Sequence, residues 1–234
     1  MGWNVARVAS RRKVLAHCSL MALAALCGAG AGAGAAVVAG AGAADVAAGA
    51  KTVLVLGDSL SAEYGLARGS GWVALLAKQL ARDKLAVSVV NASISGETTS
   101  GGRSRLPALL KLHKPSHVVI ELGGNDALRG LATPMTRDNL VVMTRAAKRA
   151  GAQVMLVGMQ LPPNYGTHYG QDFSAMFAKV AADEGTALLP FLLAGVADGP
   201  EADRLFQPDR IHPTAEAHPR MLANVWAVMK PWLH

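Results

Sequence analysis

The chain has 234 residues, of which 51% are hydrophobic and 17% charged, and it carries a formal net charge of +7 at pH 7. That length suits one well-buried domain plus an additional segment. Both cysteines, Cys18 and Cys27, precede residue 51, so the remainder has no disulfide, thiolate nucleophile or cysteine metal site. Residues 51–234 carry 19 basic and 15 acidic residues, with no basic cluster interleaved with aromatic residues, so nucleic acid is not an expected partner.

Residues 1–50 have the composition of an export signal. Four basic and no acidic residues stand in the first 20 positions, and 19 of the 23 residues from 28 to 50 are Ala or Gly, too poor in side chains to specify a core. Arg11 and Arg12 resemble the paired arginines of the twin-arginine signal. We therefore expect a periplasmic or secreted domain over residues 51–234, released after Ala43 or Ala50. An ordinary secretory signal and an uncleaved membrane anchor are the alternatives.

From residue 51 onward, apolar segments typical of strands alternate with helical patterns. The predicted strands cover residues 52–56, 86–90, 117–122, 153–157 and 186–189, and the predicted helices cover 72–80, 106–112, 140–150, 173–182 and 221–232. Nearly continuous apolar strands separated by helices predict a five-stranded parallel sheet covered on both faces. The expected fold is a three-layer α/β/α sandwich of flavodoxin-like type, with its ligand site at the carboxyl ends of the strands.

Polar segments follow the first three predicted strands. Gly57-Asp58-Ser59 follows the first, residues 91–99 follow the second, and residues 123–126 follow the third. Glycine allows a sharp turn out of a strand and leaves backbone N–H groups open to a ligand. One such segment alone is compatible with a simple turn, but three at successive strand ends indicate a common site.

A fourth polar segment, residues 207–214, contains Asp209 and His212 three positions apart. A carboxylate bound to one imidazole nitrogen leaves the other free to accept a proton from a serine hydroxyl, which predicts catalysis by Ser59, Asp209 and His212. The N–H groups of Ser59 and Gly96 and the side-chain amide of Asn125 are suitable oxyanion donors. We also expect Ser59 to open a turn into a helix, whose positive end would favour the developing charge.

Two acidic residues in these segments are expected to have structural roles and not to act as acids, bases or metal ligands. We expect Asp58 to hold the turn through backbone N–H groups and Asp126 to order the segment around Asn125. Asp58, Asp126 and Asp209 lack a histidine or cysteine at metal-ligand spacing, so neither a metal nor another cofactor is expected.

The segments GDSLSAEYG, SGETTSGG, ELGGND and DRIHP together resemble the four blocks of the SGNH/GDSL hydrolase superfamily. ELGGNDALRG, LPPNYG and LLPFLL further resemble its multifunctional acyl-CoA thioesterase I, lysophospholipase and arylesterase branch. The resemblance spans residues 51–234 and implies the SGNH hydrolase fold, a nucleophilic Ser59, oxyanion donors Gly96 and Asn125, and His212 with its partner Asp209. Glu63 departs from the small residue typical of that branch, so substrate preference does not carry over.

The resemblance also implies substrate-binding segments after the third and fourth strands. The segment 126–133 is expected to move over the acyl chain, with an apolar face formed by Ala127, Leu128, Leu131 and Ala132. The alternative is a loop packed permanently on the core. The predicted substrate-binding residues are Leu128, Leu131, Pro162 and Tyr165.

The expected activity is hydrolysis of acyl esters and thioesters, including aryl esters, acyl-CoA and lysophospholipids. The expected protein is a monomer without a stable membrane span after signal removal. Two alternatives remain: a carbohydrate acetylesterase, and a lipid-binding envelope protein whose hydrolase site is vestigial.

Overall fold

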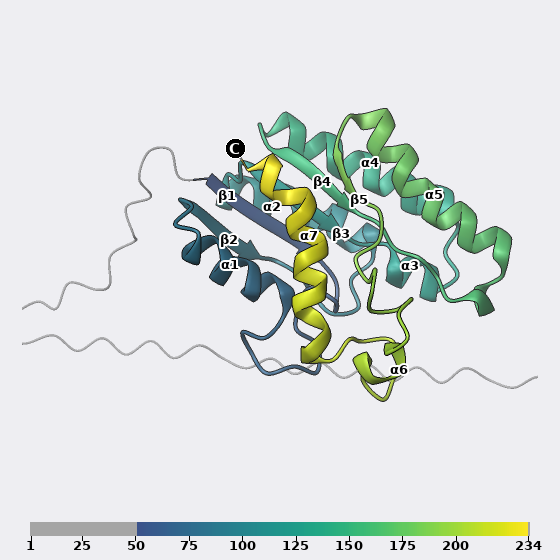
Figure 1. The fold of residues 1–234 in the computed structure, drawn as a ribbon. Helices are drawn as coiled ribbons and strands as arrows, with labels where there is room; N and C mark the ends of the chain where they lie inside the picture. Colours follow the sequence, from purple (N-terminus) through teal and green to yellow (C-terminus); the bar gives the residue numbers. More distant parts are fainter. Residues whose placement is uncertain (1–50, 234) are drawn as a thin grey trace, which may run out of the picture. The chain divides into compact units, whose positions relative to one another are not determined.

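The computed structural model describes residues 51–233, and the predicted export signal lies outside the described residues. Five parallel strands form one sheet in the order β2-β1-β3-β4-β5. The strands are β1 (Lys51–Gly57), β2 (Val87–Asn91), β3 (His117–Glu121), β4 (Gln153–Val157) and β5 (Ala187–Leu189). Helices lie on both faces of this sheet (Figure 1), which confirms the predicted three-layer α/β/α sandwich.

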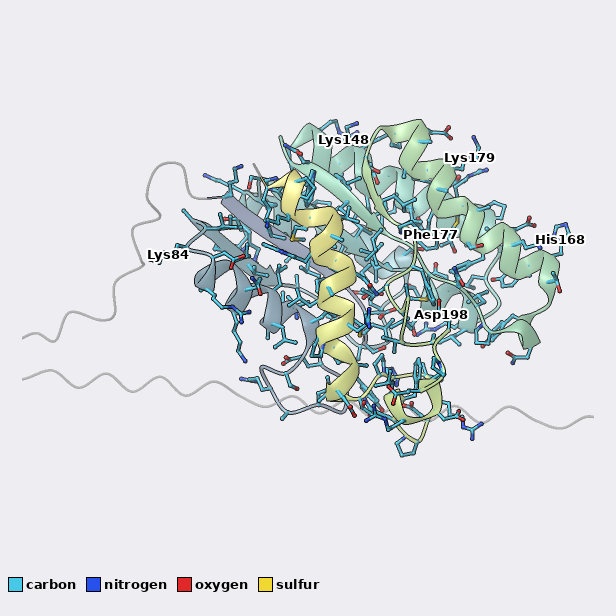
Figure 2. All side chains as sticks on the ribbon, in the orientation of Figure 1. Lys84, Lys148, His168, Phe177, Lys179 and Asp198 are labelled. Atoms are coloured by element: carbon cyan, nitrogen blue, oxygen red, sulfur yellow. The ribbon has the colours of Figure 1, made fainter. Side chains whose placement is uncertain are left out.

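Successive residues of β1 point to opposite faces of the sheet, so a continuous apolar strand supplies both halves of the core. Val53 and Val55 pack with helices α1 (Trp72–Arg82) and α7 (His218–Trp232). Leu54 and Leu56 pack on the other face, which is covered by α2 (Thr99–His113), α4 (Thr133–Arg149) and α5 (Thr167–Glu184). The labelled Phe177 of α5 belongs to this second half of the core (Figure 2). Each large side chain fully buried in this way contributes about 1.5–3 kcal/mol.

Short helical segments lie in the connections between the main elements. They are α3 (Gly124–Leu128), η1 (Pro163–Tyr165), α6 (Ala202–Leu205) and η2 (Ala215–Ala217). The segments α3 and η1 follow β3 and β4, so they stand at the carboxyl edge of the sheet where the site was predicted.

Three helices begin earlier than their apolar periodicity predicts. α2 begins at Thr99, α4 at Thr133 and α5 at Thr167, six or seven residues before the predicted starts. The start of α2 is fixed by polar contacts: the hydroxyl of Thr98 accepts a hydrogen bond from the N–H of Gly101, and Asp126 accepts one from the N–H of Thr99. Such turns carry no apolar stripe, so periodicity does not detect them.

The two ends of the described chain meet at the amino edge of the sheet. The Nζ atom of Lys51 donates to the carbonyl oxygen of Leu233. His117 Nε2 donates to the carbonyl oxygen of Trp232 over 3.3 Å, and the two rings pack edge to face with centroids 4.5 Å apart. α7 is thereby fastened to the sheet at the end opposite to the polar strand-end segments.

No helix between residues 51 and 233 has the length and apolar character needed to cross a bilayer. Within the same residues, no group of three or more His, Asp or Glu side chains is arranged to hold a metal ion.

Candidate active site

Ser59 stands in the turn that follows β1. The chain leaves the sheet at Gly57, and the N–H of Ala62 donates to the carbonyl oxygen of Asp58 over 2.9 Å. The expectation that Ser59 opens directly into a helix is wrong, because turns occupy the following residues and α1 begins only at Trp72. Hydrogen-bonded turns fix the backbone at Ser59. The positive end of a helix, which was expected to stabilise the negative charge that develops during catalysis, is therefore not adjacent to Ser59.

The structure brings the three predicted catalytic residues into one hydrogen-bonded chain. His212 Nε2 lies 2.8 Å from Ser59 Oγ, and His212 Nδ1 lies 2.6 Å from Asp209 Oδ2. Asp209 Oδ1 also accepts the backbone N–H groups of His212 and Ile211, each over 3.0 Å. The backbone and side-chain hydrogen bonds from His212, with that from Ile211, lower the pKa of Asp209 to about 2. The carboxylate is therefore charged at neutral pH and fixes the orientation of the imidazole.

The loop that carries Asp209 and His212 is closed on itself. Phe206 and Pro213 form an antiparallel bridge, and the N–H of Gln207 donates to the carbonyl oxygen of His212 over 2.8 Å. The Gln207 side-chain amide also donates to the carbonyl oxygen of Pro213 over 3.0 Å. These bonds hold His212 from both sides of the loop.

The predicted oxyanion donors lie on three different segments. Asn125 belongs to α3, and its Nδ2 atom donates to Asp58 Oδ2 over 2.9 Å, while Asp58 Oδ1 accepts the N–H of Leu60 over 3.0 Å. Asp58 thus connects the Ser59 turn to Asn125, as the sequence interpretation of a bracing residue predicts. Burial raises the pKa of Asp58 to about 6, although the hydrogen bonds from Leu60 and Asn125 oppose this shift.

The two backbone donors remain available to a ligand. Within residues 51–233, the N–H groups of Ser59 and Gly96 donate to no other group. Gly96 has a φ of +78°, a conformation that favours glycine, and a Cβ atom added there would meet no heavy atom within 4 Å. Its carbonyl oxygen accepts Arg129 Nη2 over 3.0 Å. Neither N–H group is therefore already used by another acceptor in the described part of the chain.

Comparison with known proteins agrees with this arrangement. The GDSL-like Lipase/Acylhydrolase family matches residues 55–220. The chain belongs to this family. It is 53% identical to the Pseudomonas aeruginosa protein "Esterase TesA", over 80% of this chain and 91% of the relative. It is 45% identical to the Escherichia coli protein "Thioesterase 1/protease 1/lysophospholipase L1", over 74% and 80% of the two chains.

A solved structure supports the same assignment at the level of the fold. The psychrotrophic esterase EstA from Pseudoalteromonas sp., inhibited by monoethylphosphonate, is 38% identical and superposes with a TM-score of 0.74. The match covers 78% of this chain and 98% of the esterase. The fold expected from the resemblance to GDSL hydrolases is therefore confirmed.

In this GDSL-family chain, Asp126 connects three helices behind Asn125. It accepts the N–H and the hydroxyl of Thr99 at the start of α2, and the hydroxyl of Thr136 in α4 over 3.2 Å. Asp126 itself belongs to α3 and is buried. The expectation that Asp126 orders the segment around Asn125 is confirmed.

The segment 126–133 differs in part from the apolar loop that the resemblance implies. Its first residues continue α3, and Ala127 is buried in the core, so Ala127 does not form part of an exposed apolar face. Leu128 is 46% exposed. The carbonyl oxygen of Leu131 accepts the hydroxyl of Tyr169 over 3.0 Å, which ties the segment to α5. The movement expected for this segment stays a prediction.

The remaining predicted substrate-binding residues lie between β4 and α5. Pro162 is exposed and Tyr165 is half-buried. Their part in substrate binding stays a prediction.

Two residues of the site were not singled out from the sequence. Glu121, the last residue of β3, is fully buried and accepts Ser61 Oγ over 2.7 Å and the N–H of Asp58 over 3.3 Å. Burial raises the pKa of Glu121 well above its ordinary value, and the charge of Asp58 raises it further. The other residue is Tyr64, whose ring packs against that of His212. The sequence signal for Glu121 was an acidic residue at the end of an apolar strand. The signal for Tyr64 was an aromatic residue inside the GDSLSAEYG segment.

Proposed function

We propose that this chain hydrolyses acyl esters and thioesters through a covalent intermediate on Ser59. The observation that carries the proposal is the continuous hydrogen-bonded chain from Ser59 Oγ through His212 to Asp209, with distances of 2.8 and 2.6 Å. A serine hydroxyl is a weak nucleophile at neutral pH and requires an oriented base. The charged carboxylate of Asp209 supplies that orientation and stabilises the imidazolium that forms.

The reaction proceeds in two halves. His212 removes the proton of Ser59 as Oγ attacks the acyl carbonyl, and the N–H groups of Ser59 and Gly96 with the amide of Asn125 bind the oxyanion. Each well-aimed donor contributes about 3 kcal/mol of transition-state stabilisation. His212 then returns the proton to the departing alcohol or thiol, and a water molecule releases the acid by the same steps.

The substrate range follows from the printed names of the relatives, which include an esterase, a thioesterase/lysophospholipase and an arylesterase. We propose acyl thioesters, aryl esters and lysophospholipids as substrates. Nitrophenyl esters of graded acyl length, with acyl-CoA and lysophosphatidylcholine, test this range. A strict preference for acetyl esters would instead indicate the carbohydrate acetylesterase.

The catalytic assignment is tested by Ser59→Ala. We expect the variant to lose at least about a thousandfold in kcat and to lose covalent labelling by a fluorophosphonate, with its melting temperature unchanged. Undiminished esterase activity in Ser59→Ala, or a phosphonate adduct on another residue, would contradict the role of Ser59. Either result would favour the alternative in which the hydrolase site around Ser59 is vestigial.

We propose that residues 1–50 export the protein to the periplasm or the medium. The basic start and the Ala/Gly-rich continuation support this location. Fractionation of cells that express the full chain is the test, and retention of the uncleaved chain in the cytoplasm contradicts it. A monomer is also proposed, because all residues of the proposed machinery come from one chain. Light scattering coupled to size exclusion tests that state.

A further inference from the structure

Tyr64 lies directly against the imidazole of His212. The two ring centroids are 4.2 Å apart, with an angle of 36° between the ring planes. Tyr64 is nevertheless 49% exposed, although large aromatic side chains are usually more deeply buried. One part of the ring therefore packs on His212, while another part of the side chain is open to solvent beside that histidine.

Glu63 fixes the loop that presents Tyr64. Glu63 has a φ of +60°, a left-handed conformation that is unfavourable for residues other than glycine. Its carboxylate accepts the N–H of Gly69 over 3.0 Å and the N–H of Gly71 over 2.7 Å. These hydrogen bonds outweigh partial burial and lower the pKa of Glu63, so the carboxylate is charged at neutral pH. The loop from residue 63 to residue 71 is thus closed around this side chain.

A second set of contacts joins Tyr64 to the loop of His212. Gln207 Nε2 donates to the carbonyl oxygen of Tyr64 over 2.9 Å and also to that of Pro213 over 3.0 Å. Gly65 lies so close that a Cβ atom there would be 2.2 Å from Gln207 Oε1. The position of Tyr64 relative to His212 is therefore fixed by backbone contacts as well as by the ring contact.

The chemistry of the proposed reaction places the leaving group on this side. When the carbon–oxygen or carbon–sulfur bond breaks, His212 gives its Nε2 proton to the departing atom. That atom must therefore lie beside the imidazole, and the group attached to it extends over neighbouring surface. The exposed part of the Tyr64 ring is such a surface.

We infer that Tyr64, held by the carboxylate of Glu63, forms the wall of the leaving-group side of the site and favours leaving groups that contain a flat aromatic ring. The inference rests on the proposed serine hydrolase mechanism and extends it to a specificity-determining residue. An offset or edge-to-face contact between aromatic rings stabilises a complex more than the burial of the same apolar area does. The additional stabilisation corresponds to about twofold to tenfold in kcat/KM.

The test compares benzyl butyrate with cyclohexylmethyl butyrate. Both leaving groups are primary alcohols of similar size and acidity, and they differ in the planar π-system. We expect the wild type to favour the benzyl ester, Tyr64→Phe to keep this preference, and Tyr64→Leu to lose it by about threefold to tenfold. Tyr64→Leu that keeps the wild-type ratio, or Tyr64→Phe that loses it, would overturn the inference.

The part played by Glu63 is tested by Glu63→Gly. Glycine accepts the left-handed backbone without strain but removes the carboxylate, so the Tyr64 loop loses its internal hydrogen bonds. We expect the benzyl preference to fall while the protein stays folded, and we expect Glu63→Gln, which retains an acceptor oxygen, to keep most of it. An unchanged preference in Glu63→Gly would show that Glu63 does not hold the wall.

Lys84→Gly is the matched control for this substitution. Lys84 is also left-handed, with a φ of +54°, and is exposed between α1 and β2. Figure 2 shows Lys84 far from the lower part of the molecule, where Figure 1 places α6. We expect Lys84→Gly to leave the ester preference unchanged. Ser59→Ala tests the proposed hydrolase mechanism, because it should abolish hydrolysis of both esters. The Tyr64 variants test the leaving-group inference, because they should change the ratio of kcat/KM for the two esters.

Discussion

Asp58 joins two functional parts of the site through one side chain, because its two carboxylate oxygens bind Leu60 in the Ser59 turn and the amide of Asn125. In Asp58→Asn, an amide bonded to Leu60 would present its NH₂ group to that of Asn125, and two donors cannot pair. We expect kcat to fall about tenfold to a hundredfold with little change in KM, because an oxyanion donor is misdirected. Steady-state kinetics measures kcat and KM, and Asp138→Asn at an exposed position is the control. A change in KM larger than the change in kcat would contradict this role of Asp58.

Glu121 makes the stability of the fold decline as the pH rises. Because its pKa is raised in the folded state, ionisation at higher pH favours the unfolded chain, and the free energy of unfolding falls as the pH rises above about 4.5. Glu121→Gln retains an acceptor for Ser61 and the N–H of Asp58 but cannot ionise. We expect the difference in melting temperature, variant minus wild type, to increase by a few degrees from pH 5 to pH 8. A constant difference across this range contradicts the assignment.

The residues predicted from sequence and those overlooked differ in the range of their contacts. Ser59, Asn125, Asp209 and His212 occupy short segments whose residue types state their chemistry, and the structure brings them together. The role of Glu63 depends on a left-handed backbone and on N–H groups six and eight residues away. Neither is visible in a local pattern, so sequence alone left its effect unexplained.

At the scale of elements, His218 connects the first and last helices. Its Nδ1 atom accepts the N–H of Trp72, the first residue of α1, over 3.0 Å, while His218 begins α7. Burial lowers the pKa of His218 to about 4, since the protonated ring would be poorly solvated and could no longer accept that hydrogen bond.

This contact predicts loss of stability in acid. The unfolded chain binds a proton at His218 more readily than the folded chain, so the free energy of unfolding falls as the pH drops from about 6.5 to about 4. We expect His218→Asn, whose side-chain oxygen can accept from Trp72, to show a weaker decline over this interval. Urea unfolding at several pH values measures it; parallel curves for wild type and variant would refute the assignment.

The strands were predicted better than the helix starts for a physical reason. Buried parallel strands are continuous apolar segments, and all five were predicted to within one residue at each end. The first turn of α2 is polar or small and is held by a residue of another segment, since Asp126 accepts the N–H of Thr99. In α4, Thr136 of the first turn donates to the same carboxylate. The four-residue helix α6 is too short for a helical period to be read.

At the scale of the whole molecule, residues 51–233 contain both halves of the core and all residues of the proposed machinery. We expect the protein without residues 1–50 to keep its kcat/KM within about twofold and to unfold in one cooperative transition. Calorimetry and ester hydrolysis on the shortened and full chains measure this. An insoluble or inactive shortened chain would place the domain boundary elsewhere.

The contact between Lys51 and Leu233 has a practical consequence. Both ends of the described chain stand at the amino edge of the sheet (Figure 1), whereas Ser59 and His212 stand at the carboxyl edge. A carrier protein or a solid support joined at either end therefore attaches to the side away from the nucleophile. An enzyme immobilised through its ends in this way would keep its reactive side turned to the solution.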